Sequence, residues 1–196
     1  MVLNKTQSEI FKHLPALETG RLRLRRLSLR DANDVFEYAS VPDVAENVSW
    51  DYHRNISDSI NFLRLIVQQY EDCRPSPWGI VFKENSRLIG TIGFHIWSHN
   101  NFFAEVGYAL SKDYWNKGIM TEALKAVLDF GFTRMHLNRI EAMCKLNNTA
   151  SEKVMLKCGM KYEGILMQKL FAKDHFHDLK LYAILKSDFI TRNNYK

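Results

Sequence analysis

The chain has 196 residues, of which 46% are hydrophobic, and a formal net charge of +5 at pH 7. This length and apolar content are typical of one globular domain, and no repeat or long linker divides the chain. The N-terminus lacks the basic-then-apolar pattern of a signal peptide, and no apolar run reaches the ~18 residues of a membrane span. We therefore expect a cytoplasmic protein without membrane contact.

The basic charge suits a polyanionic partner, such as a phosphate-rich cofactor or ribosomal RNA. Its one dense run, residues 21–30, alternates arginine with leucine at first, which predicts a strand with one solvent-exposed face and not a nucleic-acid-binding arm. The cysteines are odd in number, and none form a C-x-x-C pair. This argues against a disulfide scaffold or zinc site and fits a reducing compartment. They are Cys73, Cys144 and Cys158.

The N-terminal part is expected to begin with a loosely held lead-in over residues 1–16. The domain proper then occupies 17–190 and a short tail 191–196. A strand is predicted over 21–27 and a short helix over 31–40, which ends near Pro42. A second helix is predicted within 55–73, where Ser57 or Asp58 is the expected cap.

The middle of the chain alternates as strands do. Strands are predicted over 77–82 and 88–97, joined by the polar turn 84–86. A further turn over 98–101 leads into a strand that ends at Leu110. After a polar loop, the apolar period changes to that of a helix over 118–135.

Gly118 lies at this change from strand to helix. The first amides of a helix lack partners inside it, so the corner suits a phosphate, although an ordinary strand-to-helix turn explains a single glycine equally well. The chain has no G-x-G-x-x-G and no G-x-x-x-x-G-K-[ST], which excludes a dinucleotide fingerprint and a P-loop.

The last part of the chain predicts a strand over 138–145, then a short helix opening at 147–149. Thr149 and Glu152 have capping-box spacing, and Gly159 is placed to end the helix. Strands over 161–171 and 178–185 follow. Several hairpins with one strand-helix-strand crossover predict an α+β or mixed α/β sheet covered by helices.

Five stretches, in this order along the chain, resemble one known family. They are LETGRLRLRRLSLRDA, RLIGTIGF, YWNKGIMTEAL, NRIEAMCKLNNTASEKVMLKCGMKYEG and HDLKLYAILKSDF. Together they resemble the GNAT superfamily of N-acetyltransferases, in the branch of the RimJ/RimL-like ribosomal-protein N-terminal acetyltransferases. The resemblance implies a single α/β (α+β) domain with a mixed, mostly antiparallel sheet flanked by helices on both faces.

The resemblance also implies acetyl-CoA as co-substrate, without a metal. The superfamily loop is R/Q-x-x-G-x-G/A, and this chain has tryptophan and methionine at its first and last positions. The expected cofactor contacts are Ala109, Leu110, Ser111, Trp115, Asn116, Lys117, Gly118, Ile119, Met120, Thr121 and Asn147. The resemblance implies that the first three act through their backbone, and the Leu110 amide is the expected donor to the thioester oxygen.

Direct attack by an amine in a ternary complex needs little base if the amine is an α-amine, whose pKa of about 7.7–8.0 leaves it partly neutral. Glu105 is the candidate base or amine-orienting group, with Glu163 as an alternative; either is otherwise an ordinary surface carboxylate. The resemblance places Ser151 and Asn147 beside the thiol, where Ser151 donates a proton to the sulfur. The two residues are four apart and are expected on one helical face, but both also suit the first turn of any helix.

Trp50, Tyr52 and His53 are the candidate acceptor contacts, unless they are surface-packing aromatics. Metal ligation by His175 and His177 has no further ligands nearby. His95 and His99 flank another turn and, like that pair, are expected at a polar hairpin tip and not in a metal site.

The implied function is N-terminal acetylation of a protein, first of all a ribosomal one, with ribosome association as a further partnership. Acetylation of a small amine (a polyamine, an aminoglycoside or an amino-acid derivative) is the alternative within enzymes. A non-catalytic acyl-CoA- or ribosome-binding module is the alternative of another class. The sequence leaves monomer and homodimer open.

Overall fold

The computed structural model describes residues 9–194. The strands are β1 Leu17–Glu18, β2 Leu22–Arg25, β3 Pro77–Phe82, β4 Arg87–Ser98, β5 Phe103–Leu110, β6 Arg139–Lys145, β7 Lys161–Ala172 and β8 His175–Leu185. The helices are α2 Ala32–Ala39, α3 Pro42–Glu46, α4 Ile56–Glu71, α5 Ile119–Thr133, α6 Thr149–Lys157 and α7 Lys186–Asn194, with 3-10 turns η1 Leu29–Asp31 and η2 Lys112–Tyr114. None of these helices has the length and apolar character needed to cross a membrane.

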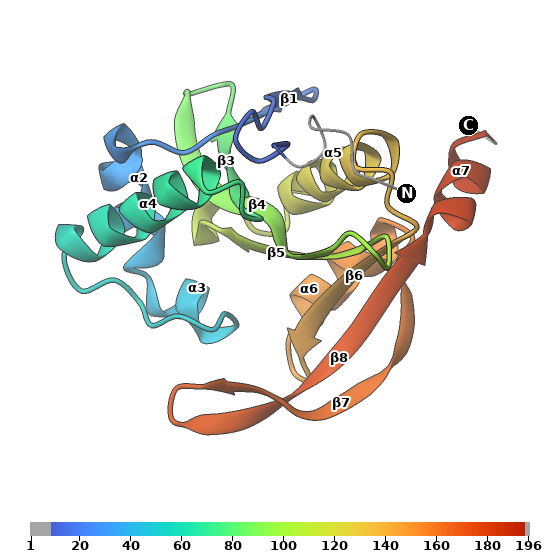
Figure 1. Cartoon of the computed structure of the whole chain (residues 1–196). Helices are drawn as coiled ribbons and strands as arrows, with labels where there is room; N and C mark the ends of the chain where they lie inside the picture. Colours follow the sequence, from blue (N-terminus) through green and yellow to red (C-terminus); the bar gives the residue numbers. More distant parts are fainter. Residues whose placement is uncertain (1–8, 195–196) are drawn as a thin grey trace.

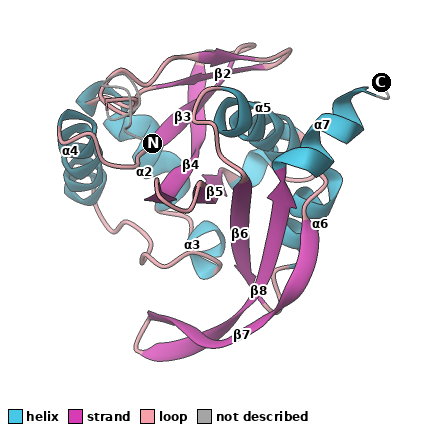
Figure 2. Ribbon diagram, turned by 45° about the vertical axis from the view of Figure 1, so that its right-hand side comes forward, coloured by secondary structure: helices cyan, strands magenta, loops and turns pink. Residues whose placement is uncertain are grey.

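The strands form one eight-stranded sheet in the order β1-β2-β3-β4-β5-β6-β8-β7. Every neighbouring pair is antiparallel except β5 and β6, which run parallel. In both views the β7–β8 hairpin projects beyond the rest of the sheet (Figures 1 and 2). The predicted mixed, mostly antiparallel single-domain fold is confirmed.

Helices cover both faces of the sheet (Figure 1). On one face, Phe130 of α5 packs edge-on against Trp78, with ring centroids 5.2 Å apart. On the other face lie α2 and α4, where Tyr38 of α2 hydrogen-bonds Thr91 of β4. The buried apolar side chains between these layers form one core that runs from Phe11 to Ile184.

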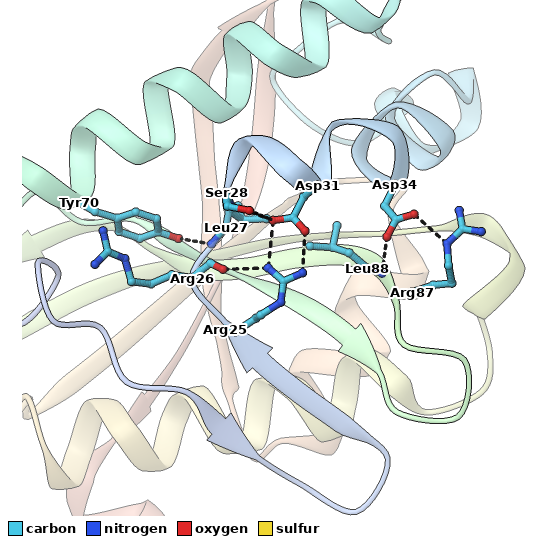
Figure 3. Close-up of polar contacts among 9 residues, drawn as sticks. All are labelled: Arg25, Arg26, Leu27, Ser28, Asp31, Asp34, Tyr70, Arg87 and Leu88. Carbon is cyan, nitrogen blue, oxygen red and sulfur yellow. Dashed lines mark hydrogen bonds and ion pairs between the residues drawn. The ribbon is translucent and has the colours of Figure 1, made fainter.

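Two aspartates dock α2 and η1 onto the sheet (Figure 3). Asp31 is 6% exposed and accepts bonds of 2.6 and 3.0 Å from the Arg25 guanidinium. Asp34 accepts from Arg87 Nε at 2.7 Å and from the backbone N–H of Leu88 at 2.9 Å. Burial alone would raise the pKa of Asp31, but the bonds from Arg25 and from the Ser28 N–H outweigh it and hold the pKa below its ordinary value.

The cap of α4 differs from the prediction. Asn55, not Ser57 or Asp58, is the N-cap, and its side chain accepts from the Ser57 N–H at 2.9 Å. Asp58 stands at the third helical position and accepts from the Asn55 N–H at 3.2 Å. Asn therefore takes the cap because its oxygen reaches the free amide two residues on, while the aspartate completes the capping box.

Three short elements were not predicted: β1, α3 and α7. Pro42, expected only to end a helix, also opens α3 as its first residue, a position that needs no N–H. The lead-in also packs more tightly than expected. Phe11 and Leu14 are buried, and the Trp78 indole donates to the Pro15 carbonyl at 2.8 Å. The apolar side chains of this segment, spaced three apart, secure it to the core.

Candidate active site

The two edges of β5 are paired to different extents. Along β4, the pairing extends over the whole strand, from Phe103 to Leu110. Along β6, it covers only Phe103 to Glu105, although β6 continues to Lys145. Beyond Glu105 the two parallel strands therefore separate, and one edge of β5 lacks a strand partner. We call the space between β5 and β6 beyond Glu105 the gap.

The direction of the β5 backbone follows from a single hydrogen bond. The Ser111 N–H donates to the Ile89 carbonyl at 2.7 Å, so Ser111 and, two residues back, Ala109 turn their backbone groups toward β4. Leu110 turns its own to the opposite side, where its carbonyl accepts from the Trp115 indole at 2.8 Å. Of the three residues expected to present their backbone to a cofactor, only Leu110 presents it to the gap.

The loop after β5 reaches α5 through two left-handed residues, Asn116 (φ 58°) and Gly118 (φ 72°). A Cβ at Gly118 would meet nothing nearer than Arg21 Nη2 at 3.7 Å, so the glycine is required by its conformation and not by space. It is the N-cap of α5, and the amides of Ile119 to Thr121 begin the helix. Helix N-termini of this kind bind anions.

Ile119 and Met120 contribute only backbone to this corner, because their side chains are buried at 1% and 5% exposure. The bulk of methionine, where the family loop has a small residue, therefore faces the core. Lys117 and Trp115 are exposed, and the Lys117 ammonium lies 5.5 Å from the centroid of the Tyr114 ring. Thr121 borders a hollow of about 790 Å³ beside the first turns of α5.

An ion pair that was not predicted holds the loop in place. Arg21 Nη1 donates to the Lys117 carbonyl at 2.9 Å, and Arg21 Nε to Glu122 at 2.7 Å. Thr19 donates its hydroxyl to the same carboxylate at 2.6 Å. Burial would raise the pKa of Glu122, but these donors outweigh it and lower the pKa. The contact joins residues about a hundred positions apart, which no local pattern reveals.

The start of α6 corrects two predictions. Asn148, not Thr149, is the N-cap: its side chain accepts from the Ser151 N–H at 3.0 Å and donates to the Ser151 hydroxyl at 3.1 Å. Asn147 precedes the helix, so it shares no helical face with Ser151. It is exposed and borders a separate hollow of about 520 Å³. The three-residue spacing from Asn148 to Ser151 is the N-cap signal that identifies the right asparagine.

Glu152 also leaves the predicted capping box and instead accepts bonds from the Lys180 ammonium (2.9 Å) and the Tyr182 hydroxyl (2.6 Å). Tyr108 connects β5 to α6, since its hydroxyl donates to the Ser151 carbonyl at 3.3 Å.

Burial raises the pKa of the Cys144 thiol to about 11, as expected for an inert packed cysteine.

Glu105 lies where the pairing of β5 with β6 ends, and its side chain is 13% exposed. Its Oε1 lies 2.7 Å from Nε2 of His95. His95 lies inside β4, within the strand predicted over 88–97, at an irregularity in the pairing with β5. The extra residue there brings its side chain onto Glu105, a contact that alternation alone does not predict.

Glu163, the alternative base, is held by Arg139. Its Oε1 accepts from Arg139 Nη1 at 2.8 Å, and its Oε2 is bonded by Nη2. This pairing lowers the pKa of Glu163 and keeps the carboxylate from accepting a proton near neutral pH.

The three acceptor candidates have different surroundings. His53 is held by the buried Ser59 hydroxyl at 2.8 Å from Nδ1, and burial lowers its pKa. Trp50 packs against the core, 5.6 Å from His53 between ring centroids. Tyr52 is 44% exposed, so it is the one of the three whose ring is open to a ligand.

The rings of His175 and His177 lie 3.9 Å apart between centroids on the β7–β8 hairpin, tilted by 52° to each other. Across residues 9–194, no group of three or more His, Cys, Asp or Glu side chains is arranged to hold a metal ion.

Comparison with known proteins identifies the family. Residues 21–161 match the acetyltransferase (GNAT) domain. The chain is 33% identical over 172 residues to the uncharacterized N-acetyltransferase YoaA of Bacillus subtilis. This alignment covers 88% of this chain and 97% of YoaA. It is 31% identical to the ribosomal-protein-serine acetyltransferase of Escherichia coli, over 71% of this chain and 82% of that protein. A GNAT-family acetyltransferase structure from Bacillus anthracis superimposes with a TM-score of 0.78 at 29% identity, covering 88% of this chain and 99% of that one.

The chain belongs to the GNAT acetyltransferase family. It is an acyltransferase, an N-acetyltransferase that uses acetyl-CoA. The helix N-terminus at Gly118 can bind an anion, and the unpaired edge of β5 lies at the other end of the same loop.

Proposed function

We propose that this enzyme acetylates the N-terminal α-amine of a protein, with ribosomal proteins as the first acceptor class. The observation that supports a polypeptide acceptor is the hollow of about 520 Å³ that α3, the end of β6 and the β7–β8 hairpin enclose together. Met167 and Phe176 of the hairpin border it and are 72% and 60% exposed. An extended peptide suits a surface of this kind, where exposed apolar side chains line a groove beside two strands.

The carboxylates of this region argue against a polycationic acceptor. Glu46 and Asp178 border the hollow together with Lys145, and Asp178 accepts from the Gln168 N–H at 2.7 Å. Outside this lining, Asp58 caps α4, and Glu163 and Glu141 are both bonded by Arg139. Asp43 of α3 pairs with Lys112. A polyamine or aminoglycoside needs several unpaired carboxylates around its site, whereas a single α-amine needs only one anionic region.

In this proposal the amides of Ile119, Met120 and Thr121 hold the diphosphate, assisted by the Lys117 ammonium and by Asn116 and Trp115 in the loop. The unpaired edge of β5 receives the pantetheine arm as an added strand through Leu110, flanked by Ala109 and Ser111. Bound acetyl-CoA supplies an activated acyl group on a thioester. The N–H group of Leu110, and that of Tyr108 two residues earlier in β5, then face the arm and the thioester oxygen.

Ser151 is proposed to donate a proton to the departing sulfur. Because Asn148 Nδ2 donates to the Ser151 oxygen at 3.1 Å, the hydroxyl proton of Ser151 is left to point elsewhere. Asn147, in the loop just before, is proposed to contact the cofactor's thiol end. Tyr52 is the proposed acceptor contact; Trp50 and His53 shape the wall behind it.

An acceptor screen tests the proposal. Thiol release from acetyl-CoA is followed with peptides of varied first residue, each supplied with a free and with an acetyl-blocked N-terminus, and with spermidine and an aminoglycoside. We expect turnover with free N-termini and none with the blocked twins, even when these contain lysine. Turnover with the small amines alone would overturn the protein acceptor. No turnover with any amine, in protein that binds CoA, would favour a non-catalytic module.

A further inference from the structure

The contact between His95 and Glu105 is the one hydrogen bond between a histidine and a carboxylate in the part of the chain that the structure describes. Glu105 is 13% exposed and His95 52% exposed, so the carboxylate is shielded while the ring faces outward. A carboxylate oxygen accepts, which requires Nε2 of the ring to be the donor. Nδ1 then has a free lone pair, and it makes no hydrogen bond to any described residue.

The pair lies at the deep end of the gap beside β5. Glu105 is the last residue of β5 that is paired with β6, and His95 reaches it from β4. A Cβ on Gly107 would come within 3.2 Å of Nδ1 and Cε1 of His95. The glycine therefore makes room for the ring directly beside the unpaired edge of the strand.

The surroundings of the pair are acidic. Glu141 on β6 is the register partner of Glu105, so both side chains lie on the same face of the sheet. Arg139 donates to Glu141 at 2.6 Å and also bonds Glu163. Arg139 thus pairs with Glu141 and Glu163, whereas Glu105 has only His95 beside it, and its carboxylate attracts an approaching ammonium.

We propose that His95 is the catalytic base that takes the proton from the acceptor ammonium at Nδ1, and that Glu105 is a positioning residue that fixes its tautomer. This inference rests on the acetyl transfer proposed above. A histidine oriented by a carboxylate is the arrangement that activates nucleophiles in many enzymes. It supplies a proton acceptor that the sequence alone did not reveal.

The proton balance is complete. The ammonium gives one proton to Nδ1 and becomes a neutral amine, whose lone pair forms the C–N bond while the C–S bond breaks. A second proton leaves the nitrogen as the amide forms, and one proton ends on the sulfur, which leaves as the thiol. The other returns from His95 to water, so the net reaction releases one proton.

Kinetics of His95→Ala test the role, with the peptide that turns over fastest in the acceptor screen. At pH 6.5 we expect kcat/KM to fall about 100-fold, within the range of general-base catalysis. Above pH 9 the loss should shrink below about fivefold, because the α-amine is then neutral without help. Imidazole added to the variant should restore activity at pH 6.5. A pH-independent loss without imidazole rescue would mean a structural role and overturn the proposal.

His136→Asn is the matched control, since His136 is exposed in the turn after α5 and far in sequence from the pair. It should leave the profile unchanged. Calorimetric titration with CoA separates the two proposals. If His95→Ala binds CoA like the unmodified enzyme but loses transfer, the base is identified. If the unmodified enzyme binds no CoA, the proposed function fails first.

Nitrogen chemical shifts give a test that needs no acceptor. In ¹⁵N-labelled enzyme at pH 8, we expect the His95 ring to be the Nε2–H tautomer. In Glu105→Gln, the chemical shifts of both ring nitrogens should change. Observation of the Nδ1–H tautomer in the unmodified enzyme would overturn the assignment of Nδ1 as the base.

Discussion

Along one edge, β5 pairs with β4 from Phe103 to Leu110; along the other, it pairs with β6 only from Phe103 to Glu105. The paired edge satisfies its amides within the protein and holds the sheet together. The unpaired edge presents amides that need a partner from outside. The same strand thus belongs to the core on one side and, in our proposal, to the cofactor site on the other, and variants can address each side separately.

The largest effect is expected at the paired edge. In Gly90→Ala, the new Cβ would lie 2.3 Å from the Ala109 carbonyl oxygen and 3.0 Å from the Leu110 Cα. Both are backbone atoms, so no side-chain rotation relieves the clash, and we expect the free energy of unfolding to fall by about 3 kcal/mol in urea denaturation.

Gly107→Ala is the matched control, because its nearest atoms belong to the exposed His95 ring at 3.2 Å. That ring can move, and the loss should stay below about 1 kcal/mol. Equal losses in the two variants would contradict the difference in packing along β4 and β5.

The helical layer behind the paired edge depends on Asp31. In Asp31→Asn, Arg25 loses the charge of its partly buried partner, and we expect about 2 kcal/mol less stability at pH 7. The pKa of Asp31 is lower in the folded protein than in the unfolded chain, where it is about 3.9. The contribution of the Asp31 carboxylate to stability is therefore fully present above the pKa of the unfolded chain. It is lost as the pH falls through the pKa that Asp31 has in the folded protein.

Urea titrations at pH 7, 5 and 3 measure this difference. The difference in the free energy of unfolding between the unmodified protein and the variant should be largest at pH 7 and should decrease toward pH 3. A difference that increases on acidification would contradict the direction of the pKa shift.

On the unpaired side, Ser151→Ala should lower kcat about tenfold, because the leaving sulfur loses its proton donor. Asn148 still caps α6 through the Ser151 N–H, so stability and CoA affinity should change little. Ser151→Thr retains a hydroxyl and serves as control. Unchanged kcat in the alanine variant would remove Ser151 from the mechanism.

Gly118→Ala addresses the helix N-terminus. A left-handed conformation costs an alanine about 1 kcal/mol, so CoA should bind about fivefold more weakly in calorimetric titration. Gly20→Ala is the control, since its Cβ would meet Glu122 at an ordinary 3.8 Å. If both variants bind CoA equally, the conformation of Gly118 does not set the affinity.

The smallest effect is expected beyond the gap, at Glu163→Gln. The carboxylate is 39% exposed, and Arg139 keeps its bond to Glu141, so stability should fall by less than about 0.5 kcal/mol. The pH profile of transfer should not move. A collapse of activity would instead make Glu163 the base and contradict its pairing with Arg139.

The sequence predicted those parts whose pattern is local. The bounds of β3 match the prediction, and α5 lies within one or two residues of it, because alternation and helical period are read directly from neighbouring residues. The loop at Gly118 was identified in the same way.

Contacts made by register and by distant segments were not predictable. The irregularity in β4 that brings His95 to Glu105, and the bond from Arg21 to the Lys117 carbonyl, depend on how strands align in space. The cap of α6 was predicted at Thr149 and not at Asn148, because the three neighbouring polar residues 147–149 all suit a cap, and only the start of the helix separates them.

Amide hydrogen exchange, measured with and without CoA, tests the central claim most directly. The account predicts that Tyr108 and Leu110, on the unpaired edge, exchange fast in the free enzyme and become protected when CoA binds. Ala109 and Ser111, bonded toward β4, should be protected in both states. If CoA leaves the exchange of Tyr108 and Leu110 unchanged, the unpaired edge of β5 does not receive the cofactor.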